Sequence, residues 1–203
     1  MRTKLTPLIA AAALVVGSAP PASAAVIYFI GQDIPIPTTF AGVSVNLETG
    51  DASNATAGAP GADMNFVLGG EGISNDADQA ASSPTWQPVR TGPGNSDAVE
   101  NLVIGAVVGP GSVTATGYGG SENHFGSFIS GTKGYLGFSM VLEDATVAYG
   151  WAEVTLQSDN TPGVIHAWAY DDTGAEIAVA VPEPTHTLLI ALGLSASTLR
   201  RRR

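Results

Sequence analysis

The chain has 203 residues, a formal net charge of −10, no cysteine and 44% hydrophobic residues. The lack of cysteine excludes disulfides, thiolate catalysis and cysteine metal sites, and this many apolar residues argues against disorder throughout the chain. The excess of acid disfavours nucleic acid as a partner, because phosphate would be repelled.

The first 24 residues have the layout of a secretory signal peptide. Arg2 and Lys4 precede an apolar run, residues 5–16, and the small residues Ala22-Ser23-Ala24 follow it. Signal peptidase cleaves after small residues in this arrangement. We therefore expect Ala22 and Ala24 to mark the cleavage site, and the mature chain to begin near Ala25.

Residues 25–181 have the size and composition of one acidic domain. This interval of 157 residues contains two basic residues, Arg90 and Lys133, and seventeen acidic ones, which gives a formal charge of −15. It is long enough to bury a core. Its acidity favours solubility, and its few basic residues present little barrier to export.

Short apolar segments between glycine and proline residues predict a series of strands. Apolar and polar residues alternate strictly in Val43-Ser44-Val45-Asn46-Leu47. In chain order, the predicted strands are residues 26–30, 43–47, 64–68, 86–89, 102–108, 125–129, 134–142, 146–156, 164–170 and 176–181. Residues 51–61 and 69–84 contain few large apolar side chains and predict long loops.

The punctuation between the strands predicts the fold class. Residues 159–163 and 171–174 are rich in the Gly, Pro, Asn and Asp that turns prefer. No long amphipathic helix is predicted in residues 25–181, and no internal repeat is visible. We therefore expect an all-β domain, a single β-sandwich with the jelly roll as one form of it.

Two aromatic segments offer a core or a ligand platform. A regular strand would place one set of side chains on one face and a second set on the other, namely Val164, His166, Trp168 and Tyr170 against Ile165, Ala167 and Ala169. Tyr149, Trp151 and Glu153 would likewise share a face. Core packing is the favoured interpretation, because aromatic residues dominate burial in such folds. The alternative is a carbohydrate platform formed by Trp86, Trp151 or Trp168.

Polar clusters give few candidates for chemistry. Three acidic pairs are candidate calcium ligands, namely Asp76 with Asp78, Glu143 with Asp144, and Asp171 with Asp172. None has the spacing of an EF-hand, and solvated turns explain the pairs as well. No other cofactor is expected. His124 lies in a polar loop sequence beside Glu122 and Asn123. No spacing singles out a catalytic pair of carboxylates, so a hydrolase ranks last among the alternatives.

Residues 182–203 differ in kind from the domain. Pro182-Glu183-Pro184 precedes the apolar run 185–199, and the chain ends in Arg200, Arg201, Arg202 and Arg203. A helix of this length spans about 22 Å, whereas the hydrocarbon core of a bilayer is roughly 30 Å thick. A transmembrane helix here would be a poor permanent anchor. The arginines should remain cytoplasmic, which would place residues 25–181 outside the membrane.

In this order, at the C-terminus of a chain with a signal peptide, these features resemble the PEP-CTERM sorting signal. The resemblance implies processing by exosortase, a membrane-embedded cysteine transpeptidase, at or near Pro182-Glu183-Pro184. Residues 134–138, 149–154 and 167–170 also resemble the β-rich region that precedes this signal in many such proteins. Most members of that group have no assigned activity.

These observations predict an exported protein, sorted through a transient membrane intermediate to the cell surface or beyond. Signal peptidase and an exosortase-type transpeptidase are the expected partners. The mature domain is expected to be a non-enzymatic component of the surface, extracellular matrix or biofilm, with extracellular polysaccharide as a further partner. The alternatives are a secreted carbohydrate-binding module and, less favoured, a secreted hydrolase.

Overall fold

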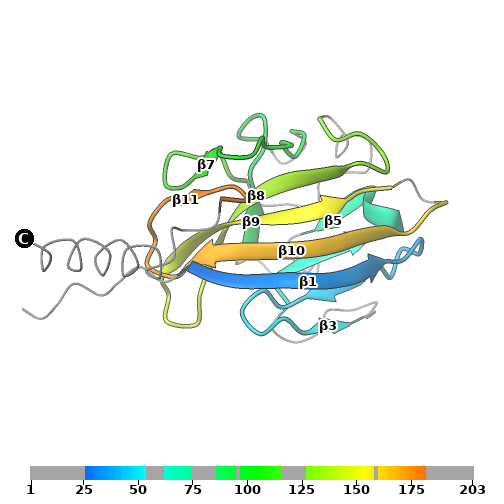
Figure 1. The fold of residues 1–203 in the computed structure, drawn as a ribbon, viewed down its shortest axis with the longest axis horizontal. Coiled ribbons are helices and arrows are strands. Elements are labelled where there is room, and N and C mark those ends of the chain that lie inside the picture. The colour runs from blue at the N-terminus through cyan, green and yellow to red at the C-terminus, as the bar shows by residue number, and fades with distance from the viewer. Residues whose placement is uncertain are drawn as a thin grey trace, which may run out of the picture.

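Antiparallel strand pairs build the part of the chain that the computed structural model describes, which comprises residues 26–53, 62–74, 86–94, 97–115, 127–157 and 160–181. The largest sheet has five strands (Figure 1), in the order β1 (Val26–Ile36), β10 (Gly163–Asp171), β9 (Val147–Thr155), β8 (Lys133–Val141) and β6 (Trp86–Pro88). The prediction of an all-β fold is confirmed.

Two smaller sheets complete the fold. The first has the order β3 (Ala52–Ser53), β2 (Val43–Val45), β4 (Met64–Val67) and β5 (Gly72–Ser74), with a short 3-10 turn, η1 (Leu68–Gly70), between its last two strands. The second pairs β11 (Ile177–Ala178) with β7 (Val107–Val108). In Figure 1 the four-stranded sheet lies behind the five-stranded one, and β7 and β11 lie beside its near face.

One hydrophobic cluster, called here the inner cluster, contains side chains from both larger sheets. The four-stranded sheet contributes Val43, Val45, Met64, Phe66 and Ile73. The five-stranded sheet contributes alternate residues of its long strands, which include Leu136, Phe138 and Met140 of β8, Ala152 and Val154 of β9, and Trp168 and Tyr170 of β10. Alternation along each strand directs these residues to one face.

Trp168 connects the two larger sheets at the centre of this cluster. Its ring is fully buried and stacks on Phe29 of β1, with centroids 4.8 Å apart. Its indole Nε1 donates a hydrogen bond to the carbonyl oxygen of Leu47, at 3.0 Å. Because Leu47 follows β2, this bond joins the two larger sheets, and it satisfies a polar group that would be costly to bury unpaired.

The opposite face of the five-stranded sheet, called here the outer face, is covered in part. A second cluster contains Trp151 and Ala169 of this sheet, together with Val108, Ile177 and Val179 of the segments that carry β7 and β11. Tyr28, Tyr135 and Tyr149 pack against its edges and are half-buried. The part of the outer face that this cluster leaves open carries polar side chains.

A β-bulge at His166 changes which side chains of β10 face the core. On β9, Val154 and Glu153 are consecutive, yet their partners on β10 are Ile165 and Ala167. The extra residue places Ile165, Trp168 and Tyr170 in the inner cluster and Ala167 in the outer one. The predicted grouping of His166 with Trp168 and Tyr170 was therefore wrong, whereas the shared face of Tyr149, Trp151 and Glu153 is confirmed.

Several predicted strand boundaries also change. β1 continues past Ile30 to Ile36, and residues 102–108 form a bridge at Leu102 and a separate strand at β7. β3 and β5 lie within the segments predicted as loops, and residues 127–129 of the predicted strand 125–129 are not in a strand. Ser44, predicted to be on a polar face, is buried and accepts a hydrogen bond from Asn65 Nδ2.

Gly150 provides a test of this packing. It pairs with Phe138 across β8 and β9, and a Cβ atom there would lie 2.3 Å from Phe138 Cζ and 2.5 Å from the carbonyl oxygen of Ala169. We expect Gly150→Ala to lower the free energy of unfolding by about 2 kcal/mol, because overpacking a filled core costs this much. Urea unfolding measures the change.

Gly111→Ala is the matched control, since a Cβ atom there meets no atom within 4 Å. Equal stability of the two variants would contradict the close packing of Phe138 on Gly150.

Candidate functional site

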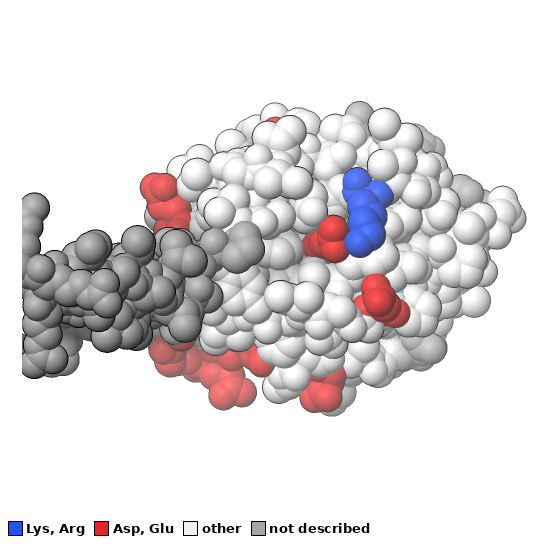
Figure 2. Space-filling model, in the orientation of Figure 1, with Lys and Arg blue, Asp and Glu red and all other residues white. Residues whose placement is uncertain are grey.

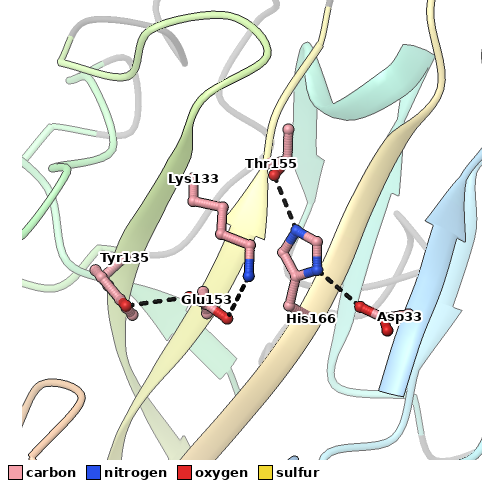
Figure 3. A network of polar contacts seen from close by, with 6 residues as sticks. All are labelled: Asp33, Lys133, Tyr135, Glu153, Thr155 and His166. Atoms are coloured by element: carbon pink, nitrogen blue, oxygen red, sulfur yellow. Dashed lines mark hydrogen bonds and ion pairs between the residues drawn. The ribbon is translucent and has the colours of Figure 1, made fainter. Parts of the chain in front are cut away.

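The open part of the outer face carries a row of polar side chains from four strands (Figure 3). They are Lys133 and Tyr135 of β8, Glu153 and Thr155 of β9, His166 of β10 and Asp33 of β1. Strand register explains the grouping, because Lys133 pairs with Thr155 and Tyr135 pairs with Glu153. Residues directly opposite on neighbouring strands share a face and are in contact range.

His166 occupies a position where both of its neighbouring strand pairs are irregular. On the β9 side it is the extra residue of the bulge, and on the β1 side it faces the irregular segment between Ile30 and Ile34. Gly31 and Asp33 there have positive φ values of 69° and 44°. Bulges of this kind turn a side chain toward a new direction, and here they bring Asp33 and His166 together.

The imidazole of His166 joins two partners. Its Nδ1 lies 2.8 Å from Asp33 Oδ1, and its Nε2 lies 2.9 Å from Thr155 Oγ1. The His166 side chain is 16% exposed, whereas that of Asp33 is 72% exposed. If Nδ1 carries the proton, it donates to the carboxylate, and Nε2 then accepts from the Thr155 hydroxyl. This neutral arrangement satisfies all three groups.

Glu153 is the centre of the second half of the row. Its Oε2 accepts from Lys133 Nζ at 3.2 Å, and its Oε1 accepts from the Tyr135 hydroxyl at 3.1 Å. The Tyr135 ring packs edge-on against Trp151, with centroids 6.0 Å apart. Burial raises the pKa of Tyr135, and the hydrogen bond to Glu153 and its negative charge raise it further.

Charge on the surrounding surface is unevenly distributed. Arg90 is buried, so within the described ranges Lys133 is the exposed basic side chain. Figure 2 shows it beside a carboxylate on a largely uncharged face, with further carboxylates at one end. The polar row therefore combines a cation, carboxylates, a hydroxyl, a phenol and an imidazole. Such a surface offers both hydrogen-bond donors and acceptors to a ligand.

The end of the molecule where β10 finishes is acidic. Burial raises the pKa of Tyr170 to about 12, with Glu48, Asp172 and Asp63 contributing. Burial also raises the pKa of Glu48, and the negative charges of Asp63, Glu143 and Asp144 raise it further. Negative charges thus converge there, which favours the protonated forms of Tyr170 and Glu48.

The predicted calcium pairs do not form a metal centre within the described ranges. Asp171 is buried, and its Oδ1 accepts hydrogen bonds from the Thr173 amide, the Thr173 hydroxyl and the Ala175 amide. It therefore shapes the turn that leads from β10 to β11. In these ranges no group of three or more histidine, aspartate or glutamate side chains is arranged to hold a metal ion. Asp76 and Asp78 lie outside the described residues, as does His124.

The tryptophan residues proposed as a carbohydrate platform are in the core. Trp86 and Trp168 are 0% exposed and Trp151 is 6% exposed. A sugar platform needs an exposed ring face, so these three residues cannot form one in this structure. The core interpretation of the aromatic strands is confirmed, because Trp168 fills the inner cluster and Trp151 the outer one.

A hollow beside β7 has two glutamate residues in its lining. It has a volume of about 420 Å³ and is lined by residues that include Arg90, Glu100, Ser112 and Glu176. The Arg90 guanidinium donates from Nη1 to the carbonyl oxygen of Asp97 at 2.7 Å, and burial lowers its pKa. The sequence singles out no catalytic pair of carboxylates, and the residues of the polar row do not line this hollow.

The processing motifs fall outside the described residues. These are Ala22 and Ala24 at one end, and Pro182, Glu183, Pro184 and the four terminal arginines at the other. The described part of the chain contains no helix of the length and apolarity that a membrane crossing requires. Comparisons of the chain with protein-family models, with curated proteins and with solved structures find no match.

Sequence reasoning did not identify the polar row as a site. It placed Glu153 with Tyr149 and Trp151, and His166 with Trp168, but it connected neither residue to Lys133 or Asp33. One signal was available, because Lys133 is one of two basic residues in residues 25–181. A second was Gly31, since a glycine within a strand pattern often marks a bulge.

The coupling of Tyr135 to Glu153 can be measured. We expect Glu153→Gln to lower the pKa of the Tyr135 phenol part of the way to its ordinary value. The negative charge is removed while burial, the largest cause of the shift, remains. An alkaline titration followed by the NMR signal of the Tyr135 ring, assigned with Tyr135→Phe, measures the change.

Glu143→Gln, in the turn at the far end of β8, serves as the control and should leave the titration of Tyr135 unaltered. An unchanged pKa in Glu153→Gln would rule out the negative charge of Glu153 as a cause of the shift.

Proposed function

We propose that the chain is an exported bacterial protein that an exosortase-type system sorts and processes, and that its mature domain is a non-enzymatic component of the cell surface or extracellular matrix. The observation that carries this proposal is the order of motifs at the two ends. A signal-peptide pattern precedes the domain, and Pro182-Glu183-Pro184, an apolar run and four arginines follow it.

The positions of the core residues support this assignment of the ends. Every member of the inner and outer clusters, including the partly buried side chains packed against them, lies between Val26 and Ala180. Cleavage after Ala24 and near Pro182 would remove none of them. The chain that remains would keep both hydrophobic clusters. A protein that is cleaved at both ends during export needs such a core to stay folded.

The two larger sheets are the basis for our assignment of a β-sandwich. Their shared cluster, with Phe66 from one sheet and Trp168 from the other, has the composition of the core between two packed sheets. A core of this size also suits a domain without cysteine, because stability outside the cell then rests on burial rather than on disulfides.

Acidity suits the proposed location. Residues 25–181 have a formal charge of −15, so the domain would remain hydrated. Copies of it at high local density would repel one another. Such a surface is compatible with a hydrated polymer matrix.

The sorting motif is tested by replacing Pro182-Glu183-Pro184 with three alanines in the natural host. We expect the full-length precursor to accumulate in the membrane fraction, because the processing enzyme would lack its recognition sequence. Mass spectrometry of the C-terminus and cell fractionation measure the outcome. Glu176→Ala, upstream of the motif, is the control. The same mature C-terminus and distribution in both variants would refute the proposed sorting.

A second candidate function is binding of a polyhydroxylated ligand, such as a matrix polysaccharide, at the polar row. The supporting observation is the concentration of donors and acceptors there, with Glu153 between Lys133 and Tyr135 and with His166 between Asp33 and Thr155. Charged side chains form the stronger hydrogen bonds to neutral hydroxyl groups. This candidate takes the place of the buried tryptophan platform.

This candidate is tested on a glycan array. We expect Glu153→Gln with His166→Ala to weaken binding by about 10-fold, since hydrogen bonds to charged groups contribute about 1.5–3 kcal/mol. Glu143→Gln, away from the row, should bind like the unaltered protein, and circular dichroism checks that each variant is folded. Binding that is equal in all three proteins would exclude the polar row as the contact surface.

A further inference from the structure

Exposed apolar side chains lie on the segment that hydrogen-bonds to the last described residues. Val103 is 74% exposed, Ile104 66% and Val107 57%. This segment is fixed to the C-terminal one by hydrogen bonds from the Gly105 amide to the Val179 carbonyl, at 2.9 Å, and from the Val179 amide to the Ala106 carbonyl, at 2.8 Å. Val181, 42% exposed, follows two residues later. We call Val103, Ile104, Val107 and Val181 the apolar tip.

The tip differs from the rest of the surface in charge. The sequence has no charged residue from 101 to 121, in a domain whose formal charge is −15. Figure 2 shows mostly uncharged atoms around β7, with a group of carboxylate atoms at the left edge of the molecule beside it. Before Val181, the nearest carboxylate in the C-terminal segment is Glu176, which lies by Gly109 at the end of the β7–β11 ladder away from Ile104. After Val181, the nearest is Glu183 of the sorting motif, which would lie at the membrane boundary rather than within the tip. Charged groups oppose entry into a lipid interface, whereas uncharged apolar side chains favour it.

We propose that the apolar tip is a membrane-facing surface, which rests in the lipid interface while the apolar run 185–199 is inserted. The inference depends on the proposed function, because it requires that run to enter the bilayer. We assign the tip to lipid because it lies close to the apolar run along the chain. Residues 182–184 alone separate Val181 from the apolar run, and a chain from Val181 to Thr185 extends at most about 14 Å.

This short connection limits what the tip can contact. A body held so close to the bilayer must turn some surface toward it, and the surface nearest the connection is the tip. Contact with lipid would fix the orientation of the domain and hold Pro182-Glu183-Pro184 at the membrane boundary, where a membrane-embedded enzyme would act. The occupant of the tip is thus the lipid interface, and the tip is vacated once the tail has been removed.

The absence of cysteine makes a site-specific test direct. In the full 203-residue chain, Ile104→Cys and Ile129→Cys each receive an environment-sensitive fluorophore. Both isoleucines are exposed, at 66% and 71%, but Ile129 lies beside the end of β9 near Leu156, away from Val179. The proteins are reconstituted into vesicles of phosphatidylethanolamine and phosphatidylglycerol, with or without lipids that carry a nitroxide quencher. Leu192→Cys, within the apolar run, reports whether that run is inserted.

We expect the nitroxide lipids to quench the label at position 104 several-fold more than the label at 129, with strong quenching at 192. Quenching at 192 combined with equal, weak quenching at 104 and 129 would overturn the tip but leave the anchor. A label at 192 that remains in water would overturn the anchor and the tip with it. A label at 104 that is shielded from water but not quenched by lipid would assign the tip to a second copy of the chain instead. Urea unfolding of both isoleucine variants checks that the fold is kept.

Discussion

The structure depends on one additional residue in β10. Ile165 and Trp168 both face the inner cluster because of the bulge at His166. In a regular strand the period of two would place them on opposite faces, and the hydrogen bond from Trp168 to Leu47 would be lost. That bond and the stacking on Phe29 connect β10 to both its neighbour β1 and the four-stranded sheet. The same residue that corrects the register points its own side chain outward. Core packing and the polar row are therefore two results of a single irregularity.

The outer face of the five-stranded sheet is divided between apolar and polar side chains. β7 and β11 cover Trp151 and Ala169, while Lys133, Glu153 and His166 occupy the part that remains open. The polar side chains there satisfy one another, so the face tolerates water without a ligand. The large core does not require covalent cross-links, which agrees with the lack of cysteine. The five-stranded sheet thus packs the inner cluster on one side, and on the other it carries a second apolar cluster beside the polar row.

Local sequence patterns predicted the strands that bury alternate residues, such as residues 134–142 and 146–156, because the period of two is visible there without knowledge of partners. They also favoured the core for Trp151 and Trp168, which are buried. The faces of β10 were assigned wrongly, since a bulge is defined by two strands and only one of them is in view when a segment is read alone. Asp33 and His166 are 133 residues apart and meet only through the β1–β10 pairing. β3 and β5 were missed because two or three residues carry too little pattern.

β1 forms one edge of the five-stranded sheet, with Ile30 exposed near its middle. An edge strand presents unpaired amides and carbonyls to which another chain can add. Here the left-handed residues Gly31 and Asp33 interrupt that row, and the exposed carboxylate of Asp33 marks the break. A second strand that paired with residues 26–30 could not continue in register toward Ile36. Copies crowded on one surface would consequently not join into fibres through β1, because this strand offers no continuous edge for pairing.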